Sequence, residues 1–330
     1  MAGQIRTYNA QVPRWPEELA RAYGACEALA RSHYENFPVA SRLLPAPMRP
    51  HVAAVYAFAR IADDMADEGT DAAPVRLARL EHWGGRLHDI VAVRDAVPPP
   101  PHDEQELVLM ATAESIRSLD LPLALFDDLL SAFGQDTTTT RYATWAELFD
   151  YCRRSANPVG RLVLRIAGYR DAALDRASDA LCTALQLTNF WQDFGRDWRA
   201  GRLYVPREVF ESFGAQEADL STIGSIDLAG AHVVRPALPT WDLSIRRCVT
   251  VTREQFEQGR AVCDGVRGRL RFELRCTWLG GMRILDRVSA VSRNRLRERP
   301  TLGTADMPGL LWQALWWRNV SGSAVRSTVA

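Results

Sequence analysis

The segment VAAVYAFARIADDMADEG, residues 52–69, sets charged and aromatic side chains at helical spacing within an otherwise apolar stretch. Tyr56, Arg60, Asp63 and Asp67 follow one another in steps of three or four residues, which keeps them on one face of a helix. A single face of this kind is also typical of a solvated helix edge. The apolar residues around it favour a helix that is largely buried.

A second polar stripe lies in ALCTALQLTNFWQDFGRDWRAGRLYVP, residues 180–206. Gln186, Asn189, Asp193 and Asp197 share one helix face, and burying them without partners would be costly. Mg²⁺ is a natural partner, because it takes one or two carboxylates together with phosphate oxygens and water. Two such stripes turned toward each other predict a site for divalent cations and a polyphosphate.

Other candidate residues carry two interpretations each. Between the stripes, Asn157-Pro158 and Gly160 mark a helix break, which could admit a substrate chain and place the Tyr151 hydroxyl near a diphosphate, or be only a kink. Arg60 could line a site or pair with Asp64 at the helix surface.

Two arginines and one histidine also allow two interpretations each. Arg199 and Arg202 follow the second stripe and are either a phosphate clamp or surface charges. His33 is a lone histidine in a predicted helix, where a structural role competes with a catalytic one.

Helical periodicity dominates the chain and predicts an all-α fold. Helices are expected over residues 17–34, 50–67, 75–93, 104–118, 122–133, 144–153, 158–168, 174–198, 242–270 and 274–297. The segment 221–241 shows no clear period and is expected to be a loop or insertion. We divide the chain into an N-terminal extension (1–16), one all-α domain (17–305) and a Trp-rich C-terminal segment with its tail (306–330).

The amino-acid composition excludes several classes of function. Forty basic and forty acidic residues leave no net charge to recruit nucleic acid. Six scattered cysteines lack zinc or disulfide spacing, which favours a reduced, cytoplasmic compartment. No stretch reaches the roughly 18 apolar residues of a membrane-spanning helix.

The patch around Trp312, Trp316 and Trp317 predicts a terminal helix that either docks on the core or anchors at a membrane interface.

Taken together, these segments resemble the squalene/phytoene synthase family, over about residues 17–305. The resemblance rests on Tyr56 to Asp67, on QLTNFWQD (186–193) with Asp197, and on GRLYVP (201–206). HYENFPVASRLLP (33–45), SANPVG (155–160) and RPTLG (299–303) are similar to the hydroxysqualene synthase branch of bacterial squalene and hopanoid formation.

The resemblance implies an isoprenoid (terpenoid) synthase helical bundle with a central cavity and Mg²⁺ bridging the acidic faces to a diphosphate. It implies catalytic roles for Asp63, Asp67, Asp193, Asp197 and Tyr151, and metal binding by Asp63, Asp67, Asn189, Asp193 and Asp197. Substrate-binding residues are expected to be His33, Tyr56, Arg60, Gln186, Asn189 and Arg202. Many phytoene synthases have serines just after the histidine, where this chain has Tyr34 and Asn36, which suits an enzyme that binds one preformed diphosphate.

The expected reaction converts presqualene diphosphate and water to hydroxysqualene, with a cation held near rings such as Phe37, Phe58, Phe190 or Trp191. No nicotinamide cofactor is expected, since G-x-G-x-x-G is absent. One alternative is condensation of two farnesyl or geranylgeranyl diphosphates to presqualene diphosphate, squalene or phytoene. Another is a non-catalytic lipid carrier or assembly protein. The oily product leaves open transient contact with the inner membrane, as a peripheral protein, or with neighbouring pathway enzymes.

Overall fold

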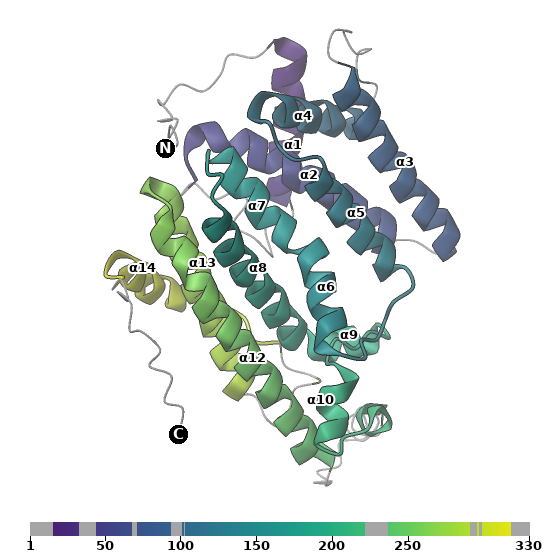
Figure 1. The fold of residues 1–330 in the computed structure, drawn as a ribbon, viewed down its shortest axis with the longest axis vertical. Coiled ribbons are helices and arrows are strands. Elements are labelled where there is room, and N and C mark those ends of the chain that lie inside the picture. The colour runs from purple at the N-terminus through teal and green to yellow at the C-terminus, as the bar shows by residue number, and fades with distance from the viewer. Residues whose placement is uncertain are drawn as a thin grey trace.

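Alanine- and leucine-rich segments form α-helices throughout the computed structural model, which describes residues 16–32, 44–67, 71–93, 101, 103–221, 237–290, 296 and 299–317 (Figure 1). The first half contains α1 (Glu17–Ser32), η2 (Ala46–Met48), α2 (Arg49–Asp67), α3 (Ala73–Ala92), α4 (Glu104–Leu119), α5 (Ala124–Asp136), α6 (Trp145–Ser155) and α7 (Asn157–Ile166). The second half contains α8 (Ala172–Gln192), α9 (Phe194–Arg199), α10 (Arg207–Ser212), α12 (Ala237–Gly265), α13 (Gly268–Ala290), η3 (Thr304–Asp306) and α14 (Met307–Leu315). Over these ranges the only β pairing is an isolated bridge between Arg141 and Leu203, so the all-α prediction is confirmed.

The helices form two packed groups. α8 contacts α6, α7, α12 and α13, and α8, α12 and α13 run side by side (Figure 1). α2 contacts α1, α3, α4 and α5 on the other side of the molecule. α7 touches both groups, through α2 and α5 on one side and α8 on the other. The two acidic stripes therefore belong to different helix groups that α7 holds together.

Local sequence signals explain several helix ends. Asp103, Thr144 and Asp171 are N-caps whose side chains accept hydrogen bonds from backbone N–H groups in the first turns of α4, α6 and α8. The predicted break at Asn157-Pro158 is confirmed, because α6 ends at Ser155 and α7 begins at Asn157 with proline in its first turn.

Three predicted boundaries were wrong. The helix expected over 174–198 is interrupted at Asp193, which separates α8 from α9. α12 begins at Ala237 rather than 242, because Pro239 lies in the first turn, where proline is tolerated. The gap between α12 and α13 falls before Gly268, whose φ of +63° is easily adopted only by glycine.

Some expectations lie outside the described residues. These include most of the N-terminal extension, His33, Tyr34, Asn36 and Phe37, and the greater part of the 221–241 segment. None of the helices in the described ranges combines the length and the apolar character required to cross a bilayer.

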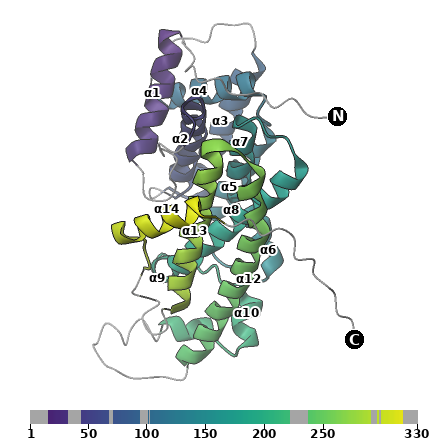
Figure 2. The same ribbon diagram turned by 90° about the vertical axis from the view of Figure 1, so that its left-hand side faces the viewer.

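α14 docks on α13 through part of its surface only. Leu310 and Ala314 are buried, whereas Trp312, Leu315 and Trp316 are each more than 60% exposed. Figure 2 shows α14 projecting from the side of the helix bundle. The docking interpretation is thus confirmed for one face of this helix, and its other face is apolar and exposed.

Candidate active site

A cavity of about 420 Å³ lies between α2, α5, α6, α7, α8 and α13, a size typical of small-molecule sites. The side chains that line it change from mainly apolar to polar along α2 and α8. On α2 the lining runs from Val52 to Asp63 and on α8 from Ser178 to Asn189, roughly 16 Å along the axis of each helix. One end is lined by Tyr56, Arg60, Asp63, Asp136, Tyr151, Gln186 and Asn189. The cavity is therefore polar at one end and mainly apolar at the other.

The first acidic stripe reaches this cavity from α2. Arg60 lines the cavity and donates to Asp63 at 3.5 Å, while its other terminal nitrogen lies 2.5 Å from Asp64. Both interpretations of Arg60 thus hold at once. Although 41% of the Asp63 side chain remains accessible, burial, reinforced by the neighbouring Asp67, raises its pKa to about 6.

An ion pair joins the two stripes at the polar end. Arg202 follows α9 and lies 3.1 Å from both carboxylate oxygens of Asp67 at the end of α2. On α9, burial raises the pKa of Asp197 to about 7, with Asp193 adding to the effect and Arg202 opposing it. The structure therefore brings the two stripes together, as the sequence predicted, with a guanidinium between them.

The second stripe divides between the cavity and its edge. Gln186 and Asn189 line the cavity from α8. Asp193, at the break between α8 and α9, accepts hydrogen bonds from Arg299, which the spacing of the sequence did not single out. Arg199 is not among the residues that line the cavity and donates to the backbone carbonyl of Leu296 at 2.5 Å, which favours a structural role over a phosphate clamp.

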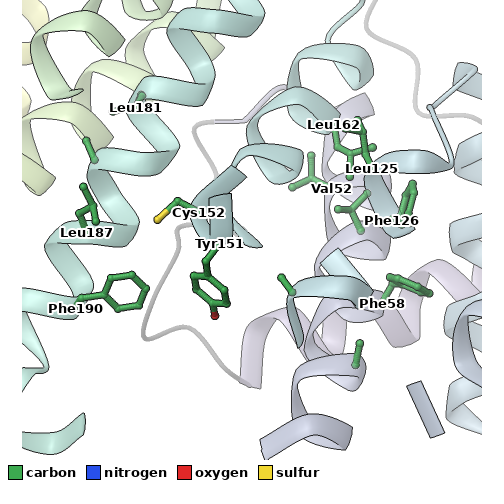
Figure 3. Close-up of a cluster of buried hydrophobic side chains, with 14 of the residues drawn as sticks. Val52, Phe58, Leu125, Phe126, Tyr151, Cys152, Leu162, Leu181, Leu187 and Phe190 are labelled. Carbon is green, nitrogen blue, oxygen red and sulfur yellow. The ribbon is translucent and has the colours of Figure 1, made fainter. Parts of the chain in front are cut away.

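Tyr151 links the polar end to an aspartate that the sequence analysis missed. Its hydroxyl donates to Oδ2 of Asp136 at 2.7 Å, and both residues line the cavity. The Tyr151 ring lies 6.2 Å from that of Phe190 and points between α8 and α2 (Figure 3). Asp136 was missed because it lies between the helices expected over 122–133 and 144–153, where no helical spacing related it to the two stripes.

Three of the four rings expected to stabilise a cation lie in the described ranges, and none of these three lines the cavity. Phe58 packs 5.4 Å from both Trp83 and Phe126, away from the Tyr151 side of the bundle (Figure 3). Phe190 stacks on Tyr204 at 3.8 Å, and the Trp191 indole N–H donates to Thr252 at 2.8 Å. Phe58, Phe190 and Trp191 belong to the core, because each of them already contacts another ring or a hydroxyl group there. Among the described residues, the rings that line the cavity are Tyr56, Phe133 and Tyr151.

The helix break between α6 and α7 forms part of the cavity wall. Ser155, Ala156, Val159 and Gly160 all line it. A Cβ atom at Gly160 would lie 2.3 Å from the hydroxyl of Ser178 on α8, so glycine is required for the close approach of α7 and α8. The break thus contributes to the cavity, as predicted for a break that admits substrate.

The donor set at the polar end suits a hard cation. In the described ranges, no group of three His, Cys, Asp or Glu side chains is close enough to hold a metal ion by itself. The oxygen donors are nevertheless of the kind that Mg²⁺ prefers, and Mg²⁺ commonly completes its shell with phosphate oxygens and water. The raised pKa values of Asp63 and Asp197 show carboxyl groups that lack full charge compensation. These residues fit a metal that arrives with a diphosphate.

One prediction concerns Asp197. Its pKa lies near 7 in the folded protein and near 3.8 when unperturbed, so between these values only the folded state retains the proton and the stability contribution falls as pH rises. Without metal, the free energy of unfolding of Asp197→Asn relative to wild type should therefore increase from pH 4 to pH 8, by up to about 4 kcal/mol. Urea unfolding at several pH values measures it. Asp120→Asn, at a side chain that is 97% exposed, is the control. A difference independent of pH would contradict the assignment.

The fold and the site together define a class of protein. It is an all-α bundle around a cavity that is acidic at one end and apolar at the other. Comparison with known proteins agrees. The squalene/phytoene synthase family profile matches residues 30–306. The chain is 40% identical over 188 residues to the hydroxysqualene synthase of Zymomonas mobilis and 39% identical over 192 residues to that of Sinorhizobium fredii. These alignments cover 56% and 58% of this chain, and only 59% and 61% of the relatives.

A solved structure is similar to this chain over a larger share of its length. Squalene synthase HpnC from Alicyclobacillus acidocaldarius is 36% identical, with a TM-score of 0.72 over 84% of this chain and 96% of that one. The phytoene synthase of Mycobacterium tuberculosis is 32% identical over 210 residues, 64% of this chain and 65% of that protein. The chain belongs to the squalene/phytoene synthase family.

Proposed function

We propose that the protein converts presqualene diphosphate and water to hydroxysqualene and diphosphate, with Mg²⁺. The observation that carries this proposal is the cavity, whose polar end is lined by Arg60 and Asp63 and whose other end is mainly apolar. Such a cavity fits a prenyl chain with a diphosphate at one end. The relatives named hydroxysqualene synthase support the choice of reaction.

At the polar end, Asp63, Asp67, Asn189, Asp193 and Asp197 would hold the metal. Bound Mg²⁺ would neutralise negative charge on the departing diphosphate.

The guanidinium groups stand beside these acids. Arg202 is already paired with Asp67, and Arg299 with Asp193, so a diphosphate would exchange these partners for its own oxygens. Arg60, on the cavity wall, would orient the same group.

The apolar end accommodates the hydrocarbon and excludes water. When the C–O bond to the diphosphate breaks, its electron pair leaves with oxygen and a carbocation remains. The rings of Phe133 and Tyr151 line the cavity and would stabilise that charge through their π faces. Water then supplies the electron pair of the new C–O bond and loses a proton.

Head-to-head condensation of two prenyl diphosphates is the competing reaction, and relatives named phytoene synthase and squalene synthase favour it. Two substrates of this kind need two diphosphate sites. On the described cavity wall the arginine and its acidic neighbours gather at one end. This arrangement favours a single diphosphate substrate.

The test is product analysis by mass spectrometry with Mg²⁺ and either presqualene diphosphate or farnesyl diphosphate, without and with NADPH. Hydroxysqualene from presqualene diphosphate alone is expected. A product from farnesyl diphosphate would assign the condensing reaction instead. No product and no diphosphate release from either substrate would favour a non-catalytic lipid carrier.

The exposed face of α14 supports a peripheral site at the membrane surface, where the oily product has to go. Tryptophan is enriched at the boundary between water and lipid. Replacing Trp312 and Trp316 together by serine should lower binding to phospholipid vesicles at least about tenfold in co-sedimentation. Val75→Ser, at a side chain 45% exposed on α3, is the control. Failure of the wild type to bind vesicles would favour a neighbouring pathway enzyme as the partner of α14.

A further inference from the structure

Asp136, the last residue of α5, is a buried carboxyl group that belongs to neither acidic stripe. Oδ2 accepts the hydrogen bond from the Tyr151 hydroxyl. Oδ1 is also buried and has no hydrogen-bond partner in the described part of the chain. Buried polar atoms are nearly always paired, so an unpaired carboxylate oxygen on a cavity wall indicates a partner that enters the cavity.

The neighbourhood of Asp136 raises the pKa of this carboxyl group above its ordinary value. Burial, with charge from Asp67 and Asp63, raises its pKa to about 7, while the Tyr151 hydrogen bond and Arg202 oppose the shift. The pKa of Tyr151 itself is raised well above its ordinary value, because it is buried beside Asp136. Tyr151 therefore stays a hydrogen-bond donor and fixes the orientation of the carboxyl group.

The cavity surface beside Asp136 is suited to a small number of water molecules. Phe133 lies three residues earlier on the same face of α5 and also lines the cavity. Ser155, one turn after Tyr151 on α6, presents a second buried oxygen without a partner to the same cavity. A buried water makes about three hydrogen bonds, and unpaired oxygens on a cavity wall are where it would be held.

We propose that Asp136 is the proton acceptor of the hydration step, with its free Oδ1 holding the water that attacks the carbocation. This proposal rests on the proposed function. A lone pair of the water forms the C–O bond to the cation, the electrons of one O–H bond stay on that oxygen, and the proton passes to Oδ1 of Asp136. The diphosphate leaves at the other acids, so ionisation and hydration use different carboxyl groups.

Asp136→Asn separates these steps, because asparagine retains the shape and an acceptor for Tyr151 but cannot take a proton. Diphosphate release in a single turnover should stay within about threefold of wild type. Hydroxysqualene formation should fall about 10²-fold or more, the usual contribution of a general base. The missing hydroxysqualene should appear as other C30 products. Asp127→Asn, at an exposed site on the same helix, should change neither quantity.

Each result has one meaning. If wild type makes no hydroxysqualene, the proposed function fails before Asp136 is tested. If wild type makes it and Asp136→Asn makes it equally fast, the proton acceptor lies elsewhere. If diphosphate release and hydroxysqualene fall in parallel, Asp136 acts in substrate binding or ionisation, and the proposal is overturned. Thermal unfolding of each variant confirms that it remains folded.

Discussion

Asp63→Asn should lower turnover of presqualene diphosphate by about 10²- to 10³-fold, the usual cost of removing one group that stabilises charge in the transition state. Asp63 stands where the acidic face of α2 enters the cavity. Asparagine retains its size and an oxygen but loses the negative charge that would hold Mg²⁺. Initial rates of diphosphate release at saturating Mg²⁺ measure the effect.

The same variant should bind Mg²⁺ and inorganic pyrophosphate more weakly in calorimetry. Asp71→Asn is the matched control, since Asp71 lies just beyond the acidic stripe and pairs with Arg79 at the surface. Normal turnover by Asp63→Asn would remove this residue from the metal site. Equal losses in Asp71→Asn would point to a general effect on folding.

The residues that the sequence predicted well are those whose partners lie on the same helix. Tyr56, Arg60 and Asp63 reach one cavity because helical spacing alone puts them on one face. The same holds for Gln186 and Asn189. Opposition of the two stripes could be anticipated because each would be costly to bury without a partner, and a metal ion shared between them is a natural one.

What the sequence could not show depends on contacts distant in the chain. A Cβ atom at Gly195 would lie 2.2 Å from the backbone oxygen of Leu296, so the turn after Asp193 is fixed by a segment about a hundred residues away. Arg199 also donates to that same carbonyl. Likewise, periodicity identifies Phe58 as buried but does not distinguish a core ring from a cavity ring.

Val163→Trp tests the apolar end and should lower kcat/KM for presqualene diphosphate about 100-fold, since pockets of this kind discriminate by roughly 10- to 200-fold for small changes in shape. Val163 lines the cavity on α7, one turn after Gly160, which packs against Ser178 and Cys182 in the first half of α8. An indole at this position would occupy space that the hydrocarbon needs.

The decisive contrast is between the two ends of the cavity. Binding of Mg²⁺ and inorganic pyrophosphate to Val163→Trp should stay within about twofold of wild type, because nothing at the polar end changes. Val75→Trp, on the exposed surface of α3, controls for adding an indole and should leave both quantities unchanged. Full activity of Val163→Trp would mean that the prenyl chain lies outside this cavity. Loss of pyrophosphate binding as well would mean that the two ends are not independent, and that substrate occupies the cavity in another orientation.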